Sequence, residues 1–128
     1  MKKAWLKDWP WETVVTINAA LCREKKALHK PTSDGYASAK KAWDSARDLK
    51  LTLRETFDLC RKCHKLAPFC FYNGNTFAAI GRTIIQEILQ KMPPMEAHAF
   101  RSVVGHYIAG TVGPKEMTDA LADLEPRK

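Results

Sequence analysis

The chain has 128 residues, of which 45% are apolar and 27% charged, and no apolar run approaches the roughly 20 residues of a membrane span. These proportions are typical of a globular protein and exclude a disordered chain. The N-terminal stretch MKKAWLKDWPWETVV is interrupted by Asp8, Pro10 and Glu12, so it does not resemble a signal peptide. We therefore expect a cytoplasmic protein with reduced cysteines, folded as one domain over 1–128, with 1–7 and 125–128 frayed.

The net charge of +7 is unevenly distributed along the chain. Residues 1–70 contain 15 Lys and Arg against 8 Asp and Glu, which gives +7, whereas residues 71–128 contain 6 against 6, which gives zero. Such asymmetry favours an anionic partner, with nucleic acid first and an acidic protein second. The other interpretation is a lysine-rich surface that only aids solubility.

The first helix is expected to begin near Asp8, which can cap it, with Pro10 in its first turn. Apolar residues at helical spacing predict one buried side, and the segment that follows reads REKKALHK. Its cations suit a helix C-terminus, where they meet the negative end of the dipole. They also form a candidate phosphate-binding patch, made up of Lys25, Lys26 and Lys30.

After the loop PTSDG, residues 36–67 contain neither Gly nor Pro. Apolar residues recur there every three or four positions, which is typical of the seam of a bundle or coiled coil. We expect one long helix, bent near residues 48–52, whose seam packs within the chain or makes a dimer. The alternative is two helices, because Thr52 and Glu55 form a capping-box pattern at that point.

Three of the four cysteines lie between residues 57 and 77, where Cys60, Cys63 and His64 spell C-x-x-C-H and Cys70 follows. Haem attachment to this motif follows export, which the N-terminus does not indicate. Zinc or an iron–sulfur cluster would need a fourth ligand from Cys22, His29, His98 or His106. Thiol redox chemistry prefers a helix N-terminus, and this pair lies near a helix end. We favour a structural interpretation, in which the motif continues the apolar stripe.

The residues next to this motif combine cations with aromatic rings. Arg61, Lys62 and Lys65 precede the loop that contains Phe69, Phe71 and Tyr72. Charge for phosphates and rings for base stacking are what single-stranded nucleic acid requires. The alternative, which we favour, is that the rings cover the core at a corner between helices. Arg82 joins the candidate anion-binding residues because it follows a helix N-terminus.

Turn residues divide the remaining chain into helices. Asn73-Gly74 predicts a turn, and Asn75 or Thr76 can cap a helix over about 77–92. Pro93-Pro94, Gly110 and Pro114 then separate a helix over 95–109 from a short final one. Gly81 and Gly105 interrupt two of these helices, which indicates that the helices approach closely there.

Together these observations predict an all-α, bundle-like domain of five or six helices with one long central helix. The sequence contains no Ser–His–acid pattern, no Gly-rich phosphate loop and no H-E-x-x-H, so we lean towards a non-enzymatic protein. We expect a basic subunit that docks on nucleic acid or an acidic protein, alone or as a homo-oligomer. The alternative is a zinc, iron–sulfur or thiol-redox protein that uses Cys60, Cys63, His64 and Cys70.

Overall fold

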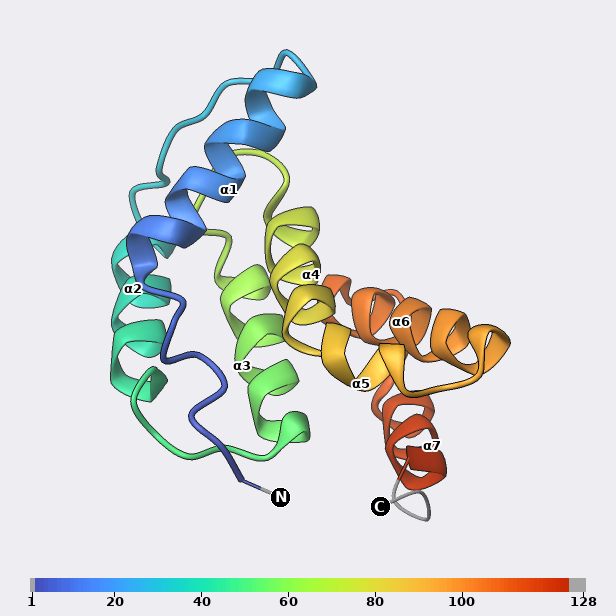
Figure 1. Cartoon of the computed structure of the whole chain (residues 1–128). Helices are drawn as coiled ribbons and strands as arrows, with labels where there is room; N and C mark the ends of the chain where they lie inside the picture. Colours follow the sequence, from blue (N-terminus) through green and yellow to red (C-terminus); the bar gives the residue numbers. More distant parts are fainter. Residues whose placement is uncertain (1, 125–128) are drawn as a thin grey trace.

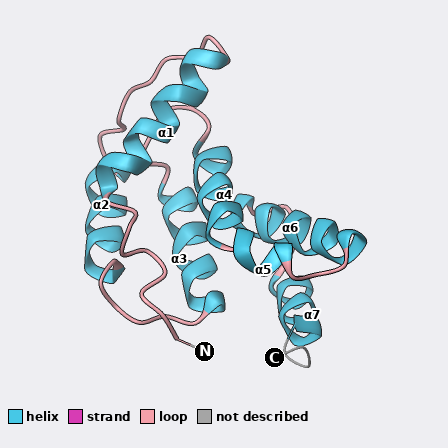
Figure 2. Ribbon diagram, viewed as in Figure 1, coloured by secondary structure: helices cyan, strands magenta, loops and turns pink. Residues whose placement is uncertain are grey.

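A computed structural model describes residues 2–124, apart from the side chain of Asp123. Helices form almost all of its regular structure, and no strand occurs in the described range (Figure 2). The helices are α1 Trp11–Glu24, α2 Gly35–Ala46, α3 Leu53–Leu66, α4 Asn73–Ile84, α5 Gln86–Gln90, α6 Pro94–Ala109 and α7 Pro114–Leu124. The predicted all-α class is confirmed, with more and shorter helices than expected. None of these helices combines the length and apolar composition needed to cross a membrane.

The expected long central helix is wrong, because α2 and α3 are separate. The Glu55 N–H donates to Thr52 Oγ1 at 3.0 Å, and the Thr52 N–H donates to Glu55 Oε1 at 2.9 Å, so the capping box is formed. Just before it, Leu51 and Lys3 exchange two backbone hydrogen bonds of 2.8 and 2.9 Å. Backbone groups that a continuous helix would pair internally are therefore paired with the N-terminal segment.

The N-terminal segment also differs from the expectation. Instead of fraying, it is tied to Leu51 through Lys3, and the Leu6 side chain is completely buried. The first helix begins at Trp11, with Pro10 rather than Asp8 at its N-cap, and ends at Glu24. Lys26 then adopts a left-handed backbone with φ 57°. The predicted frayed tail 125–128 lies outside the described residues.

The helix predicted over 77–92 starts earlier and is broken. It begins at Asn73, whose side-chain oxygen accepts from the Phe69 N–H at 3.0 Å and whose amide donates to the Phe69 carbonyl at 2.7 Å. The asparagine thus fixes the preceding loop instead of forming part of it. The break falls at Ile85, where ψ is near 4°, and α5 continues beyond it.

Aromatic side chains from distant segments form the centre of the core. Trp11 of α1 makes ring contacts with Tyr36 and Trp43 of α2, with Phe69 of the loop between α3 and α4, and with Phe77 of α4. The Trp43 indole also donates to the Trp9 carbonyl at 2.8 Å. In Figure 1, α1, α2 and α3 lie on one side of α4, with α5, α6 and α7 on the other. The aromatic cluster thus joins the first half of the chain to α4.

The predicted close approach at Gly81 is confirmed. A Cβ atom there would lie 2.4 Å from Ile108 Cδ1 and 3.4 Å from Val104 Cγ1, both of which belong to α6. Glycine therefore lets α4 and α6 pack against each other at this point. The same packing seats the side chain of Arg82 on α6, which matters for the site described below.

Candidate functional site

The cysteine motif is divided between the core and the surface. Cys60 and Cys63 are fully buried on α3, and the Cys63 thiol is 3.7 Å from the Ala39 carbonyl of α2. Burial raises the pKa of Cys60 and raises that of Cys63 to about 12, so both thiols stay protonated at neutral pH. These contacts support the structural interpretation of the two cysteines.

The other two members of the motif lie elsewhere. His64 is partly buried against Gly74 and Ala109, and burial lowers its pKa. Cys70 is exposed on the loop before α4. Among the side chains that the structure describes, no three His, Cys, Asp or Glu residues gather in a way that could hold a metal ion. The metal-centre alternative therefore stays a hypothesis of the sequence, without a geometric basis in the described residues.

This arrangement predicts thiol reactivity. Ellman's reagent should label about one thiol per native chain quickly, because Cys70 is exposed while Cys22, Cys60 and Cys63 are buried and free. The other three should react roughly a hundredfold more slowly, through local or global opening. Full labelling in denaturant gives the total of four. The Cys70→Ser variant should lose the fast phase. Fast labelling that survived this substitution would contradict the assignment.

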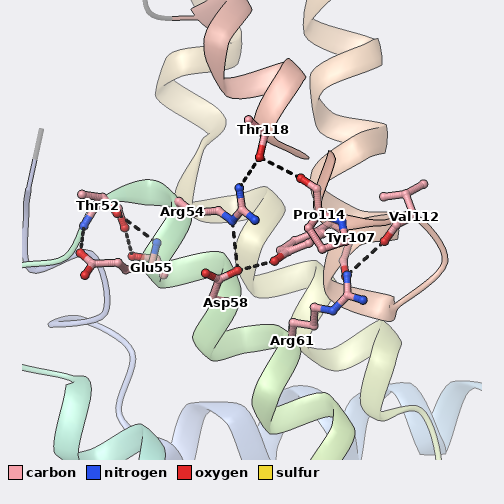
Figure 3. A network of polar contacts seen from close by, with 10 residues as sticks. Thr52, Arg54, Glu55, Asp58, Arg61, Tyr107, Val112, Pro114 and Thr118 are labelled. Carbon is pink, nitrogen blue, oxygen red and sulfur yellow. Dashed lines mark hydrogen bonds and ion pairs between the residues drawn. The ribbon is translucent and has the colours of Figure 1, made fainter. Parts of the chain in front are cut away.

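Arg61, predicted to bind an anion, is engaged within the protein. Its Nη1 donates to the carbonyls of Tyr107 at 3.1 Å and Val112 at 3.0 Å, and its guanidinium lies 4.5 Å from the Tyr107 ring centroid (Figure 3). These carbonyls lie at the C-terminal end of α6 and in the loop after it, where backbone acceptors lack helical partners. Arg61 therefore fastens α3 to α6, and we leave it out of the proposed interface.

A second arginine on α3 is engaged in the same network. The Arg54 guanidinium donates to Asp58 Oδ1 at 3.2 Å and to Thr118 Oγ1 at 2.8 Å, and the Tyr107 hydroxyl donates to the same Asp58 oxygen (Figure 3). Burial and the Asp58 carboxylate raise the pKa of Tyr107. The network ties α3 to α6 and α7 and leaves its cations internally paired. Lys62 and Lys65 are exposed on α3, outside it.

Asn18, which the sequence did not single out, organises the opposite end of the molecule. Its side chain is fully buried and donates to the Phe71 carbonyl at 2.8 Å and to Thr76 Oγ1 at 3.0 Å. Its Oδ1 is 2.8 Å from His29 Nδ1 and 3.5 Å from the Cys22 thiol. Because Oδ1 can only accept, we assign the proton of His29 to Nδ1. The sequence feature that could have identified Asn18 is its position, as a polar residue, within the apolar stripe of α1.

Two loops lie side by side next to Asn18, and we call them the loop pair: residues 25–32 and 67–72. The Cys70 N–H donates to the Lys30 carbonyl at 3.0 Å, the Thr32 N–H donates to the Pro68 carbonyl at 3.0 Å, and Pro31 forms a bridge with Phe69. The loop pair unites two regions that the sequence treated as separate candidates. Its predicted anion-binding residues are Lys25, Lys26, Lys30, Phe71 and Tyr72.

The loop pair exposes both charged and apolar side chains. Lys25, Lys26 and Lys30 are exposed, Phe71 is 49% exposed and Leu28 is 60% exposed. The rings of Phe71 and Tyr72 are in contact, with centroids 6.5 Å apart. The prediction that the loop aromatics cover the core holds for Phe69, which is buried, whereas Phe71 faces solvent on about half of its surface.

Arg82 lies apart from the loop pair, in a pocket between α4, α5 and α6. The pocket has a volume of about 380 Å³, and its lining includes Arg82 and Arg101. Sequence reasoning selected Arg82 but missed Arg101, because only the packing of α6 on α4 brings the two together. The sequence feature that could have identified Arg101 is its position one helical turn before Gly105, where a close helix approach was expected.

Comparisons with known proteins were made at three levels, and no family model, no curated protein and no solved structure matched the chain.

Proposed function

We propose that this chain is a non-enzymatic basic binding protein that docks on single-stranded nucleic acid through the loop pair. The observation that carries the proposal is the backbone pairing between the loops, which places Lys30 beside the segment that contains the half-exposed Phe71. The segment 23–30 contains four cations, Arg23 included, and the carboxylate of Glu24, which is a net charge of +3. Cations beside an exposed ring provide phosphate contacts and a stacking surface.

The rigidity of the loop pair supports this function. Asn18 holds the Phe71 carbonyl, Thr32 Oγ1 donates to the Ala67 carbonyl at 2.6 Å, and Asn73 holds both backbone groups of Phe69. A ring presented by a fixed backbone loses less conformational freedom when a base stacks on it. The structural interpretation of the lysines, that they stabilise the C-terminus of α1, accounts for their position but not for the exposed ring.

The test measures how binding depends on salt. A labelled oligothymidylate should bind the wild-type chain more weakly as salt rises. The slope of log K against log salt should flatten by about two in the variant Lys25→Gln/Lys26→Gln/Lys30→Gln, since each neutralised single-strand phosphate contributes roughly 0.7. The matched control is Lys7→Gln/Lys41→Gln/Lys50→Gln, which removes the same charge from exposed positions outside the loop pair. Equal slopes in the two variants would contradict the proposed interface.

Phe71→Ala separates nucleic acid from an acidic protein as the partner. Loss of stacking should weaken oligothymidylate binding by roughly 1–3 kcal/mol, while binding to inorganic polyphosphate, which has no bases, should be unchanged. Binding of polyglutamate without any binding of oligothymidylate at low salt would overturn the nucleic-acid version and favour an acidic protein. Anisotropy titrations with all three polyanions provide these results.

A further inference from the structure

The pocket between α4, α5 and α6 is separate from the loop pair, and its chemistry is different. We infer that it binds the phosphate group of a small phosphorylated molecule, through the guanidinium groups of Arg82 and Arg101. The pocket of about 380 Å³ is lined by Ala79, Arg82, Thr83, Gln86, Leu89 and Arg101, so no carboxylate belongs to this lining.

The Arg82 guanidinium lies against the backbone of α6. A Cβ atom on Gly105 would lie 2.2 Å from Arg82 Nη2 and 2.4 Å from both Cζ and Nε, so the guanidinium lies directly against this glycine. The Arg82 Nε is buried and has no hydrogen-bond partner in the described part of the chain. Buried donors are normally satisfied, and an arginine fork matches the oxygens of phosphate. The covered Nε is out of a ligand's reach, so an oxyanion in the pocket would meet Arg82 at its terminal Nη groups.

Arg101 adds a second positive charge to the same pocket. It lies four residues before Gly105 on α6, which places both residues on one face of the helix. Burial lowers the pKa of Arg82, and the nearby Arg101 lowers it further. Among the described side chains, no ion pair with a carboxylate offsets this repulsion for either arginine. If Arg82 only covered apolar surface, a second arginine beside it would add repulsion without any benefit. An anionic ligand bound between Arg82 and Arg101 would relieve that repulsion.

The remaining lining indicates the size and kind of ligand. The volume lies near the lower end of the range for small-molecule pockets, roughly 300–1,000 Å³, which leaves room for more than a phosphate group. Leu89 and Ala79 offer apolar surface and Gln86 a side-chain amide. The Thr83 hydroxyl donates to the Ala79 carbonyl at 2.8 Å, so it can only accept from a ligand. A phosphomonoester with a hydroxylated body fits these groups.

The test titrates the full chain with inorganic phosphate and with ribose 5-phosphate at constant ionic strength, and follows thermal stability and backbone amide shifts. Both ligands should raise the melting temperature and shift amides of α4 and α6, since a ligand that binds only the native state stabilises it. Arg101→Gln should weaken phosphate affinity roughly tenfold or more. Lys41→Gln, which removes an exposed cation of α2 outside both the pocket and the loop pair, is the matched control and should leave affinity unchanged.

Gly105→Ala provides a second variant with a structural readout. The new Cβ would displace only the tip of a flexible side chain, so the protein should fold, with Arg82 moved and phosphate stabilisation lost. If inorganic phosphate alone stabilises, the occupant is a free oxyanion; if ribose 5-phosphate also does, it is a phosphorylated small molecule. Either result supports the site. The absence of any shift, or equal responses in Arg101→Gln and Lys41→Gln, would overturn it.

These results are independent of the proposed function. The Lys25→Gln/Lys26→Gln/Lys30→Gln variant should retain the full response to inorganic phosphate, because none of its three positions lines the pocket. If the chain did not bind oligothymidylate, the proposal that the pocket binds phosphate would be unaffected. Conversely, if the pocket did not bind phosphate, the proposed function of the loop pair would be unaffected.

Discussion

Replacing Gly35 by alanine should destabilise the protein by about 3 kcal/mol or more, because the new methyl group meets backbone that cannot move aside. A Cβ at this position would lie 1.9 Å from the Leu66 carbonyl oxygen and 2.5 Å from that of Ala67. The Ala67 backbone is fixed at both ends: its N–H donates to the His64 carbonyl at 3.0 Å, and its carbonyl accepts from Thr32 Oγ1 at 2.6 Å. Relief requires separation of α2 from the end of α3.

Urea unfolding followed by circular dichroism measures this effect, and Gly74→Ala is the matched control. Gly74 lies in the first turn of α4, where a Cβ would come no closer than 3.3 Å to a side-chain atom of His64. Helix propensity favours alanine there by up to about 1 kcal/mol, which should offset the tighter contact. Similar midpoints for the two variants would show that the start of α2 can shift, contrary to the packing described.

Replacing Asn18 by leucine should cost about 3 kcal/mol, since leucine keeps approximate volume but removes every polar contact. The Phe71 carbonyl and the His29 imidazole would each lose a partner in a part-buried site, and Thr76 would lose one of its two hydrogen bonds. Buried polar groups left without partners account for most of such losses. The loop pair should also become more mobile, because Asn18 links both of its loops to α1 and α4.

The control for Asn18 is Thr16→Ala on the same helix. Thr16 is exposed, and its hydroxyl donates only to the Glu12 carbonyl, at 2.9 Å. Its loss should change stability by less than about 0.5 kcal/mol. Faster amide exchange of residues 27–32 and 67–72 in Asn18→Leu, measured by NMR, would report the loosened loops. Unchanged exchange together with a small stability loss would mean that water replaces the asparagine contacts without consequence.

Helix class and several helix ends were predictable because local chemistry determines them. Pro94 and Pro114 begin α6 and α7, and Gly110 follows α6 with a φ of 85°, as expected of residues that tolerate these positions. The capping box of Thr52 and Glu55 was also visible in the sequence. Such signals depend on residues within one turn of each other, so a single sequence contains all the information they need.

The choice between one central helix and two depended on a distant segment. The apolar stripe runs on through the break because α2 and α3 bury their faces in one core, so periodicity alone favoured continuity. The backbone pairing of Lys3 with Leu51 supplied partners for groups that the interrupted helix leaves open. No residue near Ile85 signalled the break between α4 and α5.

The sequence by itself determined that the chain is helical, that its first half is basic, and which residues were candidates. Only the tertiary structure separated Arg61, engaged with carbonyls of another helix and loop, from Arg82, seated on Gly105 beside Arg101. Likewise, it buried Cys60 and Cys63 while exposing Cys70. The physical reason is that helical character, proline starts and glycine ends depend on interactions between neighbours in sequence. Whether a cation or thiol stays accessible is set by the groups that distant segments place beside it.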